Sequence, residues 1–209
     1  TDDAALVPKA PLIEAIAEVR WSLVETPQGE RVDPGYRLLP GKLSDRLSPK
    51  FPVFVDLPQA NVPVELMPQA VRHQFRPGAE DWPVIQLGPG VVTLNYTTDY
   101  SWTAFFEQLK ELVKTLADCY PKGQHPFRIS GLDLRYLSRF AVETDASWPE
   151  QLERKFGIKV GIPQPGRVAD DRDAVFKNLR VAQTTWHQDI AGRATLNVSV
   201  AYQDEAPFF

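Results

Sequence analysis

The sequence predicts an α+β fold, a curved and mostly antiparallel sheet with helices packed on one face. Three observations predict it. Segments in which apolar and polar residues alternate recur along the chain, and this pattern is typical of half-buried strands. Two other segments carry apolar residues at helical spacing. A Gly-Pro-Gly run at residues 88–90 separates two strand-like segments and indicates a tight hairpin turn.

Length and composition indicate a globular protein of one large domain or two small ones. The chain has 209 residues, of which 43% are hydrophobic and 24% charged, and this is enough to form a sizeable core. No apolar run approaches the roughly 18 residues of a membrane-spanning helix, so no membrane partner is expected. A net charge of −4 argues against a mainly electrostatic nucleic-acid binder.

Two features favour a cytoplasmic protein. Cys119 is the single cysteine, so no intramolecular disulfide can form, as is usual in a reducing compartment. The first fifteen residues show no basic region followed by an apolar one, and we expect no signal peptide.

The first half of the chain begins with an alternating strand at 15–24, in which Val19 and Trp21 face one way and Glu18 and Arg20 the other. Asp33-Pro34 has the pattern of a helix start and predicts a helix over 34–48 that ends before Pro49. We expect an irregular, partly extended connection over 49–69. Three strands are then predicted at 71–76, 84–87 and 91–97, and a long amphipathic helix is predicted to begin at Ser101.

The second half begins at residues 127–142, which predict the central strand of the sheet. Alternation there places Asp133, Arg135 and Arg139 on one face and Leu134, Tyr136 and Phe140 on the other. The remaining elements are expected to be a short helix from Ser147 to about Phe156, a loop at 157–172 and antiparallel strands at 174–186 and 193–202, joined through residues 189–192.

The two halves share a short motif. Residues 18–21 and 133–136 both read acid, aliphatic, arginine, aromatic, and the expected order of elements also repeats. We therefore predict pseudo-repeat halves over 10–123 and 124–209, within a single domain over 1–209. The second half would lack its third strand and closing helix, so we expect the biological chain to continue past Phe209.

The polar faces of the predicted strands hold the candidate site residues. If these strands are neighbours, the side chains converge on one surface where arginines could hold an anionic or planar ligand. Two other interpretations remain open, a solvated face stabilised by cross-strand pairs and a structural ionic network. The candidate ligand-binding residues are Glu18, Arg20, Arg72, Gln86, Asn95, Asp133, Arg135 and Arg139.

The sequence shows no catalytic signature. The three histidines are far apart and lack the spacing of metal ligands, and a lone cysteine cannot build a zinc site. No G-x-S-x-G elbow is present. Glu18 and Asp133 could form an acid–base pair, but the adjacent arginines would keep both ionised. We therefore name no catalytic residue, metal or cofactor.

Several segments together resemble a sporadically distributed family of uncharacterised bacterial proteins. The resembling residues are Pro11-Leu12-Ile13-Glu14-Ala15 with Glu18 and Arg20, Ile85-Gln86-Leu87-Gly88-Pro89 with Leu94 and Asn95, Trp102 with Phe106, and Leu134-Arg135-Tyr136 with Arg139. The chain departs from the family pattern at Ser101, where proline and glycine are usual before the tryptophan, and at Ser138, where asparagine is usual. The resemblance implies a fold, site positions and a longer chain, but no chemistry.

Three functions follow from these observations. The first is a non-enzymatic cytoplasmic protein that binds an unknown protein partner or a small anionic ligand through its polar sheet face. The second is an enzyme whose phosphorylated or nucleotide-like substrate is held by Arg20, Arg135 and Arg139. The third is RNA binding across the sheet through Arg72, Arg76 and Tyr136. The sequence leaves the oligomeric state open.

Overall fold

The structure, a computed structural model, describes residues 12–64, 66–97, 99–123, 125–139, 148–157, 159, 179–187, 192–203 and 206–208. The backbone divides into two compact units, Leu12–Leu137 and a second one that includes Ser138–Phe209. The single domain and the repeat halves over 10–123 and 124–209 stay predictions.

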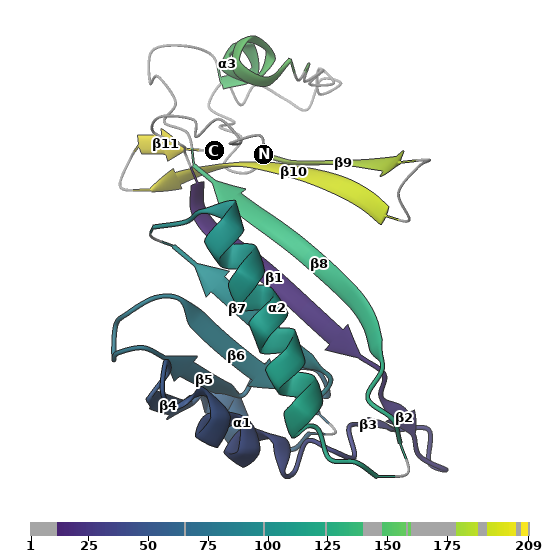
Figure 1. The fold of residues 1–209 in the computed structure, drawn as a ribbon. Helices are drawn as coiled ribbons and strands as arrows, with labels where there is room; N and C mark the ends of the chain where they lie inside the picture. Colours follow the sequence, from purple (N-terminus) through teal and green to yellow (C-terminus); the bar gives the residue numbers. More distant parts are fainter. Residues whose placement is uncertain are drawn as a thin grey trace. The chain divides into compact units, whose positions relative to one another are not determined.

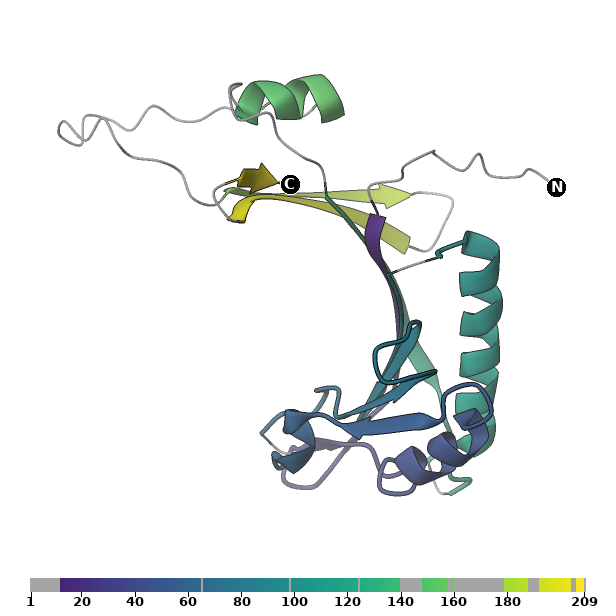
Figure 2. The same ribbon diagram turned by 90° about the vertical axis from the view of Figure 1, so that its left-hand side faces the viewer.

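The first unit is built on a weakly curled antiparallel sheet of six strands, which confirms the predicted α+β class. The strand order is β4-β5-β6-β7-β1-β8, and a separate short hairpin pairs β2 with β3. Helices α1 (Leu39–Leu47) and α2 (Trp102–Cys119) lie on one face of the sheet (Figures 1 and 2). The strands are β1 (Leu12–Trp21), β2 (Val24–Glu25), β3 (Arg31–Val32), β4 (Val53–Asp56), β5 (His73–Arg76), β6 (Val84–Gly88), β7 (Val91–Tyr96) and β8 (Ile129–Ser138).

The core lies between this sheet and α2. On β1, Ala17, Val19 and Trp21 are buried as the alternation predicts. Helix α2 begins at Ser101, whose hydroxyl accepts a hydrogen bond from the Ala104 backbone N–H at 3.2 Å. Its apolar stripe of Phe105, Leu109, Leu112 and Leu116 is buried, so the predicted helix and its orientation are confirmed.

Helix α1 is shorter than the predicted helix over 34–48, because Asp33 has another role. Its carboxylate is buried and accepts hydrogen bonds from Trp21 Nε1 (2.8 Å), the Gly90 N–H (3.0 Å) and the Tyr120 hydroxyl (2.6 Å). It also accepts one from the Gly35 N–H at 3.0 Å, which forms a turn rather than a helical start. Asp33 thus ties the end of β1 to the β6–β7 turn and to the end of α2.

The turn between β6 and β7 needs glycine at its last position. Gly90 has φ +69°, in the left-handed region that glycine adopts without strain. The space beside it is also filled, since an added Cβ would lie 2.6 Å from a methyl group of Leu23. The predicted strands at 71–76, 84–87 and 91–97 are present as β5, β6 and β7.

The predicted connection over 49–69 contains more regular structure than expected. It holds the edge strand β4 and a 3₁₀ turn, η1 (Pro58–Asn61). Arg72 is buried beneath this connection and donates to the carbonyl oxygens of Gln59, Val62, Pro63 and Met67. These bonds satisfy backbone acceptors that have no strand partner, and so they fix the connection in place.

The prediction that 127–142 is the central strand is wrong for the described sheet. Strand β8 lies at its edge, next to β1. Leu134 and Tyr136, expected to be buried, are 41% and 48% exposed. The reason is that β8 has only one neighbouring strand, and α2 packs over β1 and β7 instead (Figure 1).

The second unit contains α3 (Trp148–Phe156) and a three-stranded antiparallel sheet of order β11-β10-β9. Strands β9 (Leu179–His187) and β10 (Gly192–Gln203) confirm the predicted long pair, and α3 confirms the short helix. Strand β11 (Ala206–Phe208) was not predicted. Phe140, Ser147 and most of the predicted loop at 157–172 and turn at 189–192 lie outside the described residues.

Candidate functional site

The polar face of the first unit is formed by residues that face away from α2. In the strand register Glu18 of β1 is opposite Thr93 of β7, and Thr93 is opposite Gln86 of β6. Directly opposed residues of antiparallel strands point to the same face, so these three side chains share it. Asn95 and Arg20 are two residues from Thr93 and Glu18, and therefore join them.

Two arginines converge on Glu18. Arg20 donates from Nε to Glu18 Oε1 at 2.7 Å, and its Nη2 lies 2.6 Å from the same oxygen. Arg135 of β8 donates from Nη2 to Glu18 Oε2 at 2.9 Å. Arg20 also donates from Nη1 to Gln69 Oε1 at 2.8 Å. We call these four residues the Glu18 cluster.

The Glu18 cluster leaves positive charge accessible. The Glu18 side chain is only 13% exposed, whereas those of Arg20 and Arg135 are 35% and 56% exposed. One carboxylate faces two guanidinium groups, so the three side chains carry one surplus positive charge. In the part of the chain that the structure describes, Nη2 is the only guanidinium nitrogen of Arg135 with a hydrogen-bond partner. Its other donors are free to bind an anion.

A second hydrogen-bond network adjoins this cluster on the same face. The Thr93 hydroxyl donates to Asn95 Oδ1 at 2.7 Å, and Asn95 Nδ2 donates to Glu14 Oε1 at 3.0 Å. Gln86 Oε1 lies 3.4 Å from the Thr93 hydroxyl. Because Thr93 and Asn95 are buried, their polar groups need these partners. The network therefore fixes the positions of these side chains rather than offering free groups to a ligand.

Three of the predicted residues stand apart from the cluster. Arg72 is buried with its guanidinium committed to backbone carbonyls, so it does not line the polar face. Asp133 is exposed on β8, and no hydrogen bond or ion pair engages its carboxylate among the described residues. Arg139 follows β8 and belongs to the second compact unit. The structure therefore brings together Glu18, Arg20 and Arg135, with Gln86 and Asn95 beside them.

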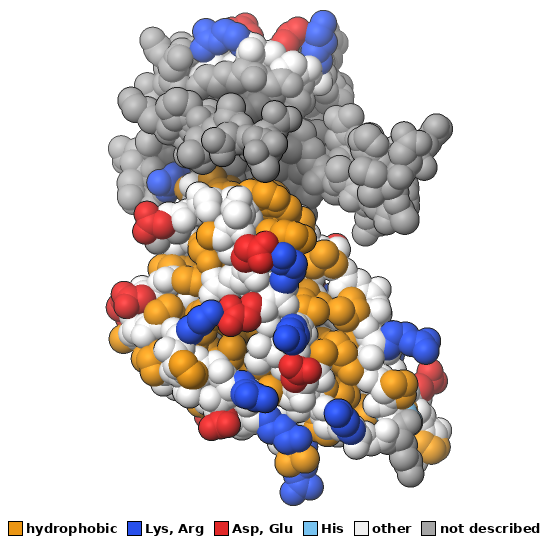
Figure 3. Space-filling view, viewed as in Figure 1, with side chains coloured by type: hydrophobic (Ala, Val, Ile, Leu, Met, Phe, Trp, Pro, Cys, Tyr) orange, Lys and Arg blue, Asp and Glu red, His pale blue; other side chains and the backbone are white. Residues whose placement is uncertain are grey.

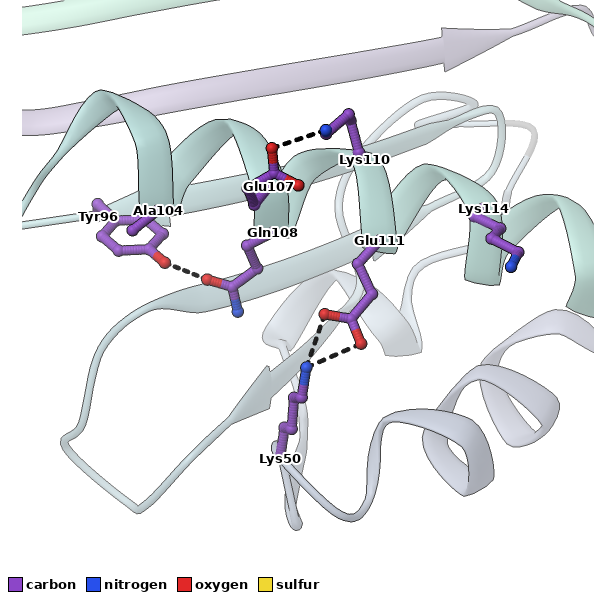
Figure 4. Close-up of a pocket in the computed structure, with 8 residues that line it drawn as sticks. All are labelled: Lys50, Tyr96, Ala104, Glu107, Gln108, Lys110, Glu111 and Lys114. Carbon is purple, nitrogen blue, oxygen red and sulfur yellow. Dashed lines mark hydrogen bonds and ion pairs between the residues drawn. The ribbon is translucent and has the colours of Figure 1, made fainter. Parts of the chain in front are cut away.

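A separate hollow of about 720 Å³ lies beside α2, on the other face of the sheet. Figure 4 shows Gln108 projecting from α2 toward Tyr96 and Glu111 toward Lys50, whereas Glu107 turns toward Lys110. Lys50 Nζ lies 2.6 Å from Glu111 Oε2, and the Tyr96 hydroxyl donates to Gln108. Lys50 and Lys110 there are exposed and paired with Glu111 and Glu107, and only Lys114 has no ion-pair partner among the described residues, so the hollow offers one lone ammonium group where the Glu18 cluster offers two converging guanidinium groups.

The tyrosines with shifted pKa values lie outside the Glu18 cluster. Burial raises the pKa of Tyr36, Tyr100 and Tyr120 above the ordinary value. The neighbouring Asp33 carboxylate raises the pKa of Tyr120 further, and the hydrogen bond with Tyr136 does the same for Tyr100. These hydroxyls stay protonated at neutral pH; those of Tyr100 and Tyr120 donate to Tyr136 and Asp33, and that of Tyr36 is buried without a partner among the described residues.

Other kinds of site find no support in the described ranges. No group of three or more His, Cys, Asp or Glu side chains there is arranged to hold a metal ion. None of the helices described is long and apolar enough to cross a membrane. His73 stacks on Tyr36 and Phe54 and contacts Asp56 through Nδ1 at 2.7 Å, which is a packing role.

Comparisons with known protein families, with curated proteins and with solved structures found no match for the chain. The resemblance to a bacterial family, on residues such as Leu134-Arg135-Tyr136, therefore stays a prediction.

Sequence reasoning missed three residues that shape this face or its support. Glu14 shares a face with Glu18, and it was left out because the strand was predicted to begin at residue 15 rather than Leu12. Extending the alternation by three residues would have found it. Gln69 accepts a hydrogen bond from Arg20, and Asp33 accepts hydrogen bonds from Trp21, Gly90 and Tyr120. These partners are distant in sequence, so no local pattern predicts either role.

Proposed function

We propose that this chain is a non-enzymatic cytoplasmic binding protein and that the Glu18 cluster holds an anionic group of its ligand or partner. The observation that carries the proposal is the convergence of Arg20 and Arg135 on one carboxylate. Glu18 holds both guanidinium groups in place, which lowers the conformational entropy lost when a ligand binds.

The chemistry of the cluster favours a carboxylate or phosphate group. Guanidinium groups present planar pairs of donors that match both anions. Both oxygens of Glu18 already accept hydrogen bonds from arginine, so Glu18 is suited to positioning rather than to proton transfer. A ligand anion would bind to the outward donors of Arg135 and to the accessible edge of Arg20.

The same two arginines would suit a phosphorylated or nucleotide-like substrate, which was the second hypothesis. That function needs a general base or nucleophile within reach of the anion. The described side chains on this face supply only Glu18, Glu14 and Asp133; the first two are engaged, and Asp133 is exposed on the edge strand with no described partner to position it for proton transfer. Binding is therefore the better supported function.

RNA binding through Arg72, Arg76 and Tyr136 gains no support. Arg72 is buried under the 49–69 connection. Tyr136 contacts Tyr100, with their hydroxyls 3.1 Å apart, and so it points to the α2 side of the sheet. Arg76 lies on the other side, opposite Val53 of β4, so the three residues do not form one surface.

A thermal-shift screen with inorganic phosphate, nucleotides, phosphosugars and carboxylates tests the proposal. At ten times its Kd a ligand stabilises the folded state by about 1.4 kcal/mol, and this raises the Tm of a chain of this size by about 3–5 °C. We expect such a rise with at least one anion, and its loss in Arg135→Gln.

The matched control is Arg37→Gln, which removes an exposed arginine from the turn before α1. It should keep the full response. If no anion stabilises the protein, or if Arg37→Gln weakens the response as much as Arg135→Gln, the Glu18 cluster is not a binding site.

A further inference from the structure

Strand β8 leaves an apolar surface uncovered on the α2 side of the sheet. Three of the thirteen exposed large hydrophobic residues in the described part of the chain lie on this side of the one strand. Tyr136 contacts Tyr100 on the α2 side, so Leu132 and Leu134, which alternate with it, face the same way. Figure 3 shows hydrophobic side chains beside the charged row of α2, over β8.

Helix α2 adds to this surface. Glu107, Gln108 and Glu111 turn toward the hollow beside Lys50. Trp102 and Phe106 lie on the opposite flank of the buried stripe and remain 45% and 40% exposed. We call Trp102, Phe106, Leu132, Leu134 and Tyr136 the β8 edge surface.

The sequence of β8 is complementary to itself. If β8 runs antiparallel to β8 of a second copy about a twofold axis at Leu134, Asp133 of each copy lies opposite Arg135 of the other. On the other face Leu134 meets Leu134, and Leu132 meets Tyr136. Moving the axis to Asp133 or to Arg135 would instead place like charges opposite one another.

We propose that β8 pairs with β8 of a second copy of this chain, in antiparallel orientation and with the twofold axis at Leu134. The backbone N–H and C=O groups of the free edge then find partners. An axis perpendicular to the sheet keeps the α2 helices of both copies on one side, where they flank the joined apolar surfaces. This proposal does not rest on the proposed function.

The charge pattern decides in favour of a second copy over an unrelated partner. Asp133 has no ion-pair partner among the described residues, and Arg135 uses only Nη2 toward Glu18. Pairing at this register gives Asp133 a guanidinium from the second copy and engages part of the free donor set of Arg135, so its remaining donors and Arg20 stay accessible to the anion of the proposed function. An unrelated partner would need the same alternation of charge by coincidence.

Sedimentation of the 209-residue chain with two charge reversals tests the register. Asp133→Arg puts two arginines opposite each other, and Arg135→Asp puts two aspartates opposite each other. Each variant alone is expected to weaken the dimer by about tenfold or more. An equimolar mixture of the two variants restores opposite charges at both pairs, and we expect a heterodimer as tight as the wild-type dimer.

A cysteine at the axis gives an independent reading. Directly opposed Cβ atoms of paired strands are close enough for a disulfide, so Leu134→Cys should oxidise to a covalent dimer. Leu38→Cys, at an exposed position before α1, is the control and should not, and Cys119 is buried in every variant. If the chain is monomeric and the Leu134→Cys variant forms no disulfide-linked dimer, two copies of β8 do not pair, and this overturns the proposal. A dimer that is indifferent to both charge reversals also overturns it.

Discussion

Strands β1 and β8 carry the same order of residue types and are neighbours in one sheet, yet their surroundings differ. In β1 the aliphatic Val19 and the aromatic Trp21 are buried, and in β8 the corresponding Leu134 and Tyr136 are largely exposed. Trp21 contacts Tyr120 and Phe127 and donates to Asp33, whereas Tyr136 contacts Tyr100 alone among the described rings. The alternation of a strand sets which side chains share a face, and the neighbouring strands and helices decide whether that face is buried.

The largest expected effect is a difference in unfolding free energy between variants of Trp21 on β1 and of Tyr136 on β8. Trp21→Ala should lower the free energy of unfolding by about 3–5 kcal/mol, because it leaves a large cavity and removes one of the hydrogen-bond donors to Asp33. Tyr136→Ala removes an exposed ring and one hydrogen bond, and should cost less than about 1 kcal/mol. Urea unfolding of both variants, at a concentration where the chain is monomeric, measures the difference. Equal losses would mean that β8 is as buried as β1.

A second pair of variants compares how much Asp33 and Asp133 contribute to the stability of the fold. Asp33→Asn leaves donors among Trp21, Gly90 and Tyr120 without an acceptor, and it should cost about 2–4 kcal/mol. Asp133→Asn on β8 changes an exposed side chain and should stay within about 0.5 kcal/mol of the wild type. The same unfolding measurement applies. A small loss in Asp33→Asn would show that Asp33 does not hold the end of β1.

The hydrogen bond from Tyr120 to Asp33, which supports the end of β1, also predicts that stability falls at alkaline pH. The pKa of Tyr120 is raised in the folded state, first by burial and then by Asp33, so the folded protein holds this proton more tightly than the unfolded chain. Its contribution to stability is complete below the unfolded pKa of about 10 and falls as the pH rises toward the folded pKa, by at most about 1.4 kcal/mol per pH unit. Tyr120→Phe has no such proton and should lose stability less steeply above pH 10. Parallel slopes for the two proteins would contradict this role.

The sequence predicted most of the strands, the long helix and which faces their residues share, because these features depend on alternation and spacing within a few residues. Glu18 and Arg20 on one face, with Val19 and Trp21 on the other, follow from period two alone. The sequence did not predict that Asp33 binds Trp21 instead of starting a helix, or that Arg72 is buried under the 49–69 connection. Both features depend on contacts distant in sequence. The edge position of β8 was missed for the same reason, because strand order is not encoded in a strand's own pattern.

The candidate site was predicted in part. Glu18, Arg20 and Arg135 do meet, because the two copies of the acid-aliphatic-arginine-aromatic motif lie on adjacent strands. The motif alone could not show that Arg135 reaches Glu18 rather than pairing with Asp133 two residues before it on β8. That choice follows from how β8 is placed beside β1, and it leaves Asp133 exposed without a partner in the described chain.

The contact between Glu18 and Arg135 is the point at which the two strands and the candidate site depend on one another. A double-mutant cycle with Glu18→Gln and Arg135→Gln, read by urea unfolding at a concentration where the chain is monomeric, measures it most directly. The partly buried ion pair predicts a coupling energy of about 0.5–1 kcal/mol, and the control cycle of Glu18→Gln with Arg37→Gln predicts none. A coupling of zero between Glu18 and Arg135 would contradict the convergence of β1 and β8 on one polar face.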